Sequence, residues 1–224
     1  MQFDNLPLIE AKCTLRFDRE IRMEYALCTS VVEAVGDSLS KVVRFISGFP
    51  VESPLAVLIG PSPGVEVTDG KGVSLVVSPQ ELAVQWRRMA PDAEYVRFPA
   101  LFDLLGKAVN AIGNPNVSVV TMSYVNKPPR HEGGPKELMI ESVWPRVQGV
   151  IRDYNVAWML DDKTEFRLQV QTLEDATLVA TAAGNLVAPN STWDEELLDV
   201  HGKLQQQFLE LLTEEARKIW QLRQ

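Results

Sequence analysis

Cysteine is nearly absent from this chain, which has only Cys13 and Cys28 among its 224 residues. Two cysteines in a chain of this length do not form a disulfide framework, so the sequence predicts buried, reduced thiols. The chain also has only two histidines, and its cysteines and histidines form no closely spaced pair. A structural zinc site needs four such ligands gathered in space. We therefore expect no metal site and no cofactor.

Long apolar runs are missing as well, since the longest, such as 55–59, span only a few residues. Runs of that length do not cross a bilayer, so we expect no membrane partner. The residues from Met1 to Pro7 lack the basic and apolar parts of a signal peptide, which predicts a cytoplasmic protein. The 22 Lys and Arg residues are outnumbered by 30 Asp and Glu residues, giving a net charge of −8. Such an acidic chain is not expected to bind nucleic acid.

Sequence motifs that carry chemistry are scarce. The glycine-bearing loops lack the spacing of a phosphate-binding loop, and the chain contains no G-x-S-x-G motif. His131 lies beside Glu132 in a loop rich in proline and glycine, where an imidazole could act as a general base. His131 is therefore the one catalytic candidate, with an ordinary loop histidine as the alternative.

The first half of the chain alternates between patterns of period two and patterns of helical spacing. Apolar and polar residues alternate from Ile9 to Asp18, and apolar residues at helical spacing run from Met23 to Ile46. The patterns and their flanking glycines and prolines predict the following order: strand 9–18, one long helix 23–46, loop 50–72 with one short strand, hairpin 73–77 and 81–88, a helix from Pro99 to Gly113, and strand 117–126. This is the β-α-β-β-α-β order of a ferredoxin-like unit with an inserted loop.

The second half begins after a proline- and glycine-rich stretch at 127–135. Strands are predicted at 148–158, 164–171 and 176–187, followed by one long amphipathic helix that starts at Thr192 and extends through Ile219. We predict an α+β fold with a mainly antiparallel sheet and three principal helices. The expected domains are a ferredoxin-like unit (1–126), a connection (127–147), and a meander with the C-terminal helix (148–224), with one continuous domain as the alternative.

Several short motifs are distributed along the chain. Their residues are Pro7, Glu10, Ala11, Trp86, Arg87, Tyr124, Asn126, Leu198, Asp199, His201, Phe208, Leu212 and Thr213. These motifs resemble those of a sporadically distributed bacterial family of uncharacterised cytoplasmic proteins. The resemblance covers nearly the whole chain, although Ser123 stands where the family has arginine. It implies a shared α+β fold and supplies no substrate.

These observations favour a protein without catalytic activity that binds a protein partner or forms a homo-oligomer, as an accessory protein in a bacterial defence or toxin-neutralising module. We expect the apolar side of the C-terminal helix to pack in the core, and as the alternative its residues Leu204, Phe208 and Leu211 are candidate interface residues. A second hypothesis is a binder of a small apolar ligand between sheet and helix. Its candidate lining residues are Trp144, Tyr154, Trp158 and Phe166. A third is an enzyme that uses His131 and a carboxylate.

Overall fold

The fold was analysed in a computed structural model of the 224-residue chain. The structure describes residues 2–3, 8–36, 39, 42–46, 64–91, 93–128, 139–140, 153–173, 176–219 and 222–223. Its helices are α1 (Tyr25–Val35), α3 (Phe98–Ile112), α4 (Trp193–Leu211) and α5 (Glu214–Ile219). Its strands are β1 (Gln2–Phe3), β2 (Leu8–Phe17), β3 (Val42–Ile46), β4 (Gly64–Thr68), β5 (Val73–Val77), β6 (Glu81–Arg87), β7 (Val117–Asn126), β8 (Asp153–Met159), β9 (Thr164–Thr172), β10 (Thr177–Leu186) and β11 (Leu222–Arg223).

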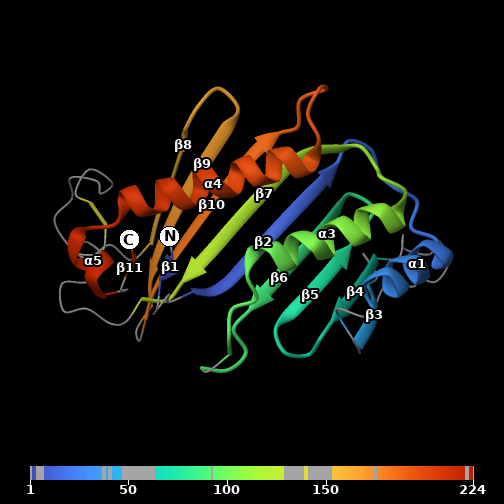
Figure 1. Ribbon diagram of the computed structural model, residues 1–224, viewed down its shortest axis with the longest axis horizontal. Helices are drawn as coiled ribbons and strands as arrows, with labels where there is room; N and C mark the ends of the chain where they lie inside the picture. Colours follow the sequence, from blue (N-terminus) through green and yellow to red (C-terminus); the bar gives the residue numbers. More distant parts are fainter. Residues whose placement is uncertain are drawn as a thin grey trace. The chain divides into compact units, whose positions relative to one another are not determined.

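The strands confirm the predicted α+β class with a mainly antiparallel sheet (Figure 1). Nine strands follow one another in the order β3-β4-β5-β6-β2-β7-β10-β9-β8, and β1 pairs with β11 separately. The chain forms two compact units. Unit 1 comprises Met1–Ala11, Thr121–Asn185 and Asp194–Gln224, and unit 2 comprises Lys12–Val120 and Leu186–Trp193. Residues 121–126 of β7 belong to unit 1 in this division, and residues 117–120 belong to unit 2.

Unit 2 keeps the predicted ferredoxin-like order once one insertion is allowed for. Helix α1 leads from β2 towards β5 with β6 lying between these strands, and α3 leads from β6 to β7 with β2 lying between them. These are two interlocking β-α-β units, as in the ferredoxin-like motif. The insertion is the β3–β4 hairpin, which extends the sheet beyond β5. The predicted short strand within 50–72 corresponds to β4, and the rest of that loop up to residue 63 lies outside the described residues.

The single helix predicted over 23–46 is wrong. Helix α1 ends at Val35, and Val42–Ile46 forms strand β3, which pairs with β4 in an antiparallel register. Three of the five residues of β3 are valine or isoleucine, whose branched side chains fit a pleated sheet better than a helix. Apolar residues in the helix and in the strand happened to continue one helical spacing, so the periodicity alone could not separate them.

Helices cover one face of the strands in unit 2. Helix α3 packs against β6 and against α1, and α1 packs against β4. The residues that α3 buries are all apolar: Phe98, Leu101, Leu104, Leu105, Ala108 and Val109. The helix ends at Gly113, whose φ of 92° lies in the left-handed region that glycine adopts readily. This end confirms the predicted stop.

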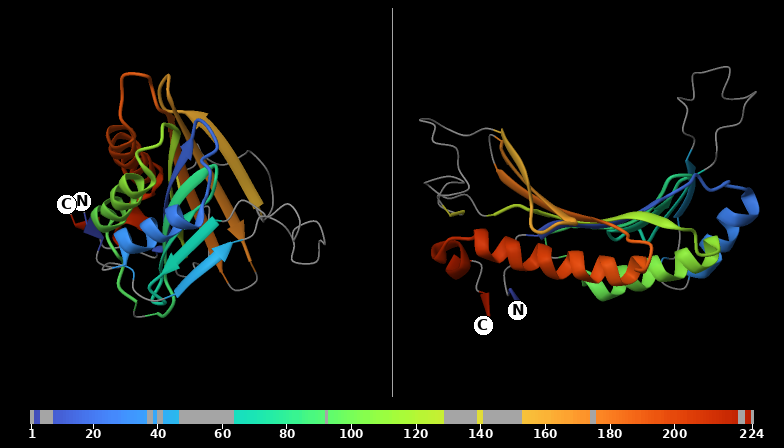
Figure 2. Two further views of the ribbon diagram at one scale, coloured as in Figure 1. Left: turned by 90° about the vertical axis from the view of Figure 1, so that its right-hand side faces the viewer. Right: turned by 90° about the horizontal axis from the view of Figure 1, so that it is seen from above.

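Unit 1 is a three-strand meander, β8-β9-β10, completed by β7 and covered on one face by α4 (Figure 2). The meander confirms the three predicted strands within the described residues, and residues 148–152 of the first prediction lie outside them. The helix predicted to continue through Ile219 is shorter than expected, because α4 ends at Leu211 and α5 begins at Glu214. Between them the Thr213 hydroxyl accepts the backbone N–H of Ala216, which starts a new helix. None of the described helices is long and apolar enough to span a membrane.

Candidate functional site

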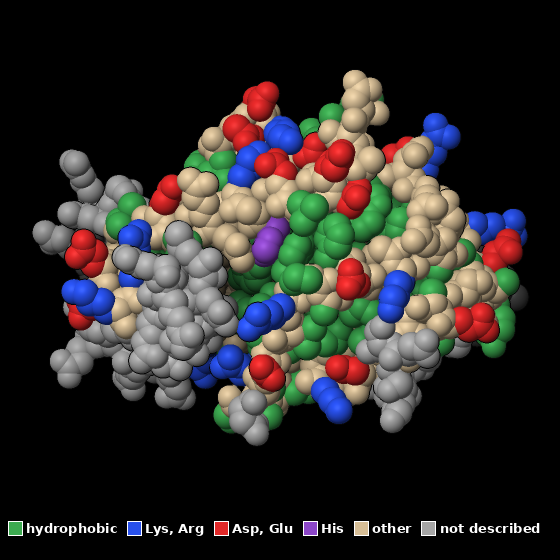
Figure 3. Space-filling model, viewed as in Figure 1, with side chains coloured by type: hydrophobic (Ala, Val, Ile, Leu, Met, Phe, Trp, Pro, Cys, Tyr) green, Lys and Arg blue, Asp and Glu red, His purple; other side chains and the backbone are tan. Residues whose placement is uncertain are grey.

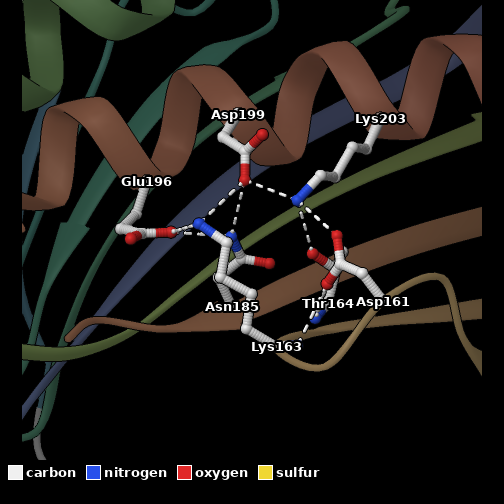
Figure 4. A network of polar contacts seen from close by, with 7 residues as sticks. All are labelled: Asp161, Lys163, Thr164, Asn185, Glu196, Asp199 and Lys203. Carbon is white, nitrogen blue, oxygen red and sulfur yellow. Dashed lines mark hydrogen bonds and ion pairs between the residues drawn. The ribbon is translucent and has the colours of Figure 1, made fainter.

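The largest group of interacting polar side chains among the described residues lies in unit 1, where the first half of α4 crosses the meander (Figure 4). We call it the polar network. Helix α4 contributes acidic residues in its first turn, where they complement the positive end of the helix dipole. The members of the network are Asp161, Lys163, Thr164, Asn185, Glu196, Asp199 and Lys203.

One half of the polar network is built around Glu196. The Lys163 ammonium donates to Glu196 Oε2 at 3.0 Å and lies 3.1 Å from Asp199 Oδ2. From the end of β10, Asn185 Nδ2 donates to the same oxygens at 2.7 and 3.2 Å. Glu196 is buried, with only 4% of its side chain exposed, so its carboxylate depends on these two donors.

The other half of the polar network is built around Lys203. Its Nζ atom lies 2.6 Å from Asp161 Oδ2 and 2.7 Å from Asp199 Oδ2, and it donates to Thr164 Oγ1 at 3.0 Å. Asp161 Oδ1 in turn accepts the backbone N–H groups of Lys163 and Thr164, which closes the turn between β8 and β9. The sequence Asp161-Asp162-Lys163 therefore forms the turn between the first two strands of the meander, and this turn also ties the meander to α4.

Opposite charges keep the acidic and basic groups of the network ionised. Hydrogen bonds to Glu196 and Asp199 raise the pKa of Lys163. Burial alone would lower the pKa of Lys203, but its bonds to Asp161 and Asp199 outweigh burial and raise it. The hydrogen bond from Lys203 lowers the pKa of Asp161 well below its usual range. For Asp199, burial acts to raise the pKa, and the bonds from Lys203 and Lys163 overcome it, so the pKa is lowered.

This arrangement fits attachment better than catalysis. A catalytic lysine needs a lowered pKa to act as a nucleophile or base near neutral pH, whereas both lysines here are held as ammonium groups. The described residues hold no group of histidine, cysteine and acidic side chains suited to a metal ion. Figure 3 shows acidic and basic side chains interspersed over this end of α4. The polar network thus fixes α4 on the β8–β9 turn and on the end of β10.

Residues from two motifs of the family resemblance meet in unit 1. The ring centroids of Tyr124 on β7 and His201 on α4 lie 6.4 Å apart, and Asp199 of the polar network is two residues before His201. Burial lowers the pKa of His201 to about 4, so its imidazole is neutral at pH 7. In unit 2 Trp86 is buried, with 1% exposure. These motif residues therefore contribute to packing.

Both cysteines are buried and free. Burial raises the pKa of Cys13 to about 12 and also raises the pKa of Cys28. A thiol with a raised pKa is a poor nucleophile at neutral pH, because the thiolate is the reactive form.

The aromatic candidates for a ligand cavity are only partly brought together. Trp158 on β8 pairs with Phe166 on β9, and their ring centroids are 4.8 Å apart. Phe166 is fully buried, and Tyr154 lies on the same side of β8 as Trp158. Trp144, like the catalytic candidate His131, lies outside the described residues.

The three candidate interface residues on the C-terminal helix lie in the core of unit 1. The exposed fractions of Leu204, Phe208 and Leu211 are 0%, 7% and 4%. Side chains so deeply buried are not available to a partner in this structure, and their burial agrees with the predicted core role of the helix. Helix α4 is amphipathic, and its apolar side, which carries these three residues, faces the sheet.

The surface that sequence reasoning missed is the face of the unit 1 strands opposite α4, which we call the open face. Contacts with α4 by Tyr124, Thr164 and Asn185 show which residues point towards the helix, so their neighbours along each strand point away from it. Among the described residues no helix covers this side (Figure 2). The open face consists of Thr121, Ser123 and Val125 on β7, Leu178, Ala180, Ala182 and Gly184 on β10, Glu165, Arg167, Gln169 and Gln171 on β9, and Asp153, Asn155, Ala157 and Met159 on β8.

The charged side chains of the open face lie on β9 and β8. The strands β7 and β10 carry only small or uncharged side chains there, all partly exposed. On β9, Arg167 lies 3.1 Å from Glu165, and both side chains are more than half exposed. The alternation of side chains along each strand was visible in the sequence. The sequence did not indicate which of the two faces of the strands would lack a covering helix. The chain matches no protein-family model and no curated protein.

Proposed function

We propose that the protein is a binding protein without catalysis of its own, and that the open face of unit 1 contacts a basic protein partner. The observation that carries this proposal is the partly exposed, uncharged centre of the face on β7 and β10. Protein interfaces commonly have a core poor in charge and a polar rim. The open face has an uncharged part of this kind on β7 and β10, and the charged side chains Glu165, Arg167 and Asp153 border it on the side of β9 and β8.

Two further properties support a basic protein as the partner. The net charge of −8 attracts a positively charged protein over long distance and accelerates encounter. The side chains Ala180, Ala182 and Gly184 on β10 are small, so a partner can approach the backbone closely. The narrower assignment, to a bacterial defence or toxin-neutralising module, is a proposal that rests on the scarcity of catalytic motifs in the sequence.

The two alternative functions have weaker support. A small-ligand binder would use Tyr154, Trp158 and Phe166, but Trp158 and Phe166 pack on each other. The enzyme hypothesis depends on His131, which lies outside the described residues. The polar network does not supply another catalytic base in place of His131, because both lysines of the network are held in their protonated form.

The proposal is tested by quantitative capture from the native host with the wild-type chain and two matched variants. Ala180→Arg places a long cation in the centre of the open face, and Gln205→Arg makes the same change of charge on the exposed side of α4. We expect the wild type and Gln205→Arg to retain one basic protein in a stoichiometric amount. For Ala180→Arg we expect an affinity lower by about 100-fold or more, because an unpaired charge would be buried at the interface.

Salt dependence and folding complete this test. Binding of a basic partner should weaken as ionic strength rises, because salt screens the attraction. Circular dichroism must show that Ala180→Arg remains folded with an unchanged melting temperature. The proposal fails if no basic protein is retained, or if the partner stays bound to folded Ala180→Arg and is lost from Gln205→Arg.

A further inference from the structure

Strand β8 is the last strand of the sheet order, and within the described part of the chain its only strand neighbour is β9. Natural sheets protect such edges with proline, lysine, a bulge or a very short strand. The seven residues of β8 contain neither proline nor lysine. Their register with β9 is continuous from Asp153 opposite Gln171 to Met159 opposite Glu165, without a bulge. Among the described residues this edge therefore has no other strand paired to it and is available for pairing.

The backbone groups available at this edge can be assigned from one hydrogen bond. The N–H of Leu160 donates to the carbonyl of Thr164 at 2.9 Å, at the point where the hairpin closes. In an antiparallel ladder successive residues direct their N–H and C=O groups to alternate sides. The even-numbered residues of β8 therefore bond to β9. The groups that point outward belong to Asp153, Asn155, Ala157 and Met159.

We propose that β8 pairs with β8 of a second copy of this chain, antiparallel, around a two-fold axis at Val156. This axis places Asn155 opposite Ala157 and Asp153 opposite Met159, so every outward-pointing residue meets another outward-pointing residue. It also overlaps the whole strand. A two-fold interface of this kind closes on itself, which makes a dimer and not a fibre.

Side chains on both faces of the strand support this register. On the α4 side, Tyr154 of each copy lies opposite Trp158 of the other copy. Both residues are half-buried, and the dimer therefore contains two aromatic cross-strand pairs. On the open face, the single charge of β8, on Asp153, comes opposite Met159. No like charges are opposed across the axis. A shift of the axis to Ala157 would instead bring Asp153 opposite Asp161, which is unfavourable.

This dimer uses the edge of β8, and the partner proposed above uses the open face, so each can fail without the other. Strand pairing alone buries a small area, and we expect a dissociation constant on the order of micromolar. Two chains with a net charge of −8 repel each other at long range, so added salt should strengthen the dimer. Binding of a basic partner responds to salt in the opposite direction.

Analytical ultracentrifugation of the purified full chain over a range of concentrations tests the proposal. Ala157→Pro removes an N–H that points outward and leaves the ladder with β9 in place. We expect the dissociation constant to rise by about 100-fold or more, since the change acts twice in the dimer. Ala157→Ser keeps the N–H and is the matched control, which should dimerise as the wild type does.

The register is tested by a pair of double variants that leave the backbone unchanged. Asn155→Lys with Ala157→Lys opposes like charges across the axis and should weaken the dimer, whereas Asn155→Glu with Ala157→Lys opposes unlike charges and should preserve it. These variants also serve if Ala157→Pro does not fold. The proposal is overturned if the wild type is monomeric at all concentrations, or if folded Ala157→Pro or the double-lysine variant dimerises as tightly as the wild type.

Discussion

Helices α3 and α4 each follow a run of antiparallel strands and cover one face of them, but they are attached by different means. Helix α3 in unit 2 buries only apolar side chains. Helix α4 in unit 1 buries Glu196 in its first turn and joins the polar network through Asp199 and Lys203, while its second half buries Leu204, Phe208 and Leu211. The side chains that α3 buries are all apolar, whereas α4 also buries a carboxylate that takes part in directional hydrogen bonds.

The polar network affects where α4 lies on the strands more than how strongly it is attached to them. Apolar burial is proportional to area and does not depend on direction, so it allows a helix to shift slightly along a sheet. Hydrogen bonds require defined distances and angles. Lys203 meets Asp161 of the β8–β9 turn, and Glu196 meets Asn185 of β10, so α4 is fixed to two strand ends at once. We infer that the polar network sets the register of α4, and that apolar contacts supply most of its binding energy.

The largest expected effect tests whether apolar packing supports both helices. Phe208→Ala in α4 should lower the free energy of unfolding by about 3 to 5 kcal/mol, and Leu105→Ala in α3 by about 2 to 5 kcal/mol, because both side chains are buried. Urea unfolding followed by circular dichroism measures both. If Phe208→Ala left stability unchanged and abolished a complex instead, α4 would be a docking helix and the core assignment would be wrong.

A smaller effect is expected from the polar network. Lys203→Met removes the cation shared by Asp161 and Asp199 and should cost about 1 to 3 kcal/mol, since charge-assisted hydrogen bonds are lost and the carboxylates stay close together. The matched control is Arg22→Met, whose ion pair with Glu24 has side chains 90% and 59% exposed. That change should stay within about 0.5 kcal/mol. Equal effects for both variants would show that the polar network stabilises the fold no more than an exposed ion pair does.

The next prediction is a pH dependence specific to unit 1. The pKa of His201 is lowered to about 4 from an ordinary value of 6.5, so between these values the unfolded chain binds more protons than the folded one. Stability should therefore rise with pH across that window and fall on acidification through it. His201→Gln, which does not titrate, should flatten the slope of melting temperature against pH from about 4 to 6.5. An unchanged slope would show that His201 is not the responsible group.

A second acid effect should appear at lower pH. The pKa values of Asp161 and Asp199 are lowered in the folded chain, so their contribution is present above their unfolded values and is lost as pH falls through the folded ones. Asp161→Asn should reduce this steeper loss below about pH 4 and leave the slope between pH 4 and 6.5 intact. A change in the upper window instead would mean that the two groups are coupled.

Much of the fold follows from sequence periodicity, and its failures have physical causes. The strict alternation from Ile9 to Asp18 and the stripe ending at Gly113 each predicted one element, because flanking residues agreed with the pattern. The segment from Met23 to Ile46 failed because a helix and a strand shared one spacing. Pairing of β3 with β4 decides that case, and such pairing depends on residues far away in the sequence.

The candidate site was less accessible from the sequence. The acidic start of α4 and the turn at Asp161-Asp162-Lys163 each had a local explanation, as a helix terminus and as a hairpin turn. That Lys203 joins them depends on how α4 lies across the meander. Asn185 gave no signal at all, since an asparagine at the end of a strand is ordinary. Local patterns predict elements, whereas the network arises from their packing.

The smallest predicted effect compares the two helices at a matched position. Gly202 in α4 and Gly106 in α3 lie inside their helices, and a Cβ atom added at either would meet no atom within 4 Å. Alanine lowers the conformational entropy of the unfolded chain, so Gly106→Ala and Gly202→Ala should each stabilise the fold by about 0.5 to 1 kcal/mol. Gly113→Ala is the control and should destabilise it, because the φ of 92° is strained for alanine. The thermal melts of the three variants distinguish a helix that tolerates a stiffer backbone from one that does not. If Gly202→Ala destabilised the chain while Gly106→Ala stabilised it, the polar network would need a backbone adjustment that glycine permits, and directional attachment of α4 would then have a conformational cost that α3 does not bear.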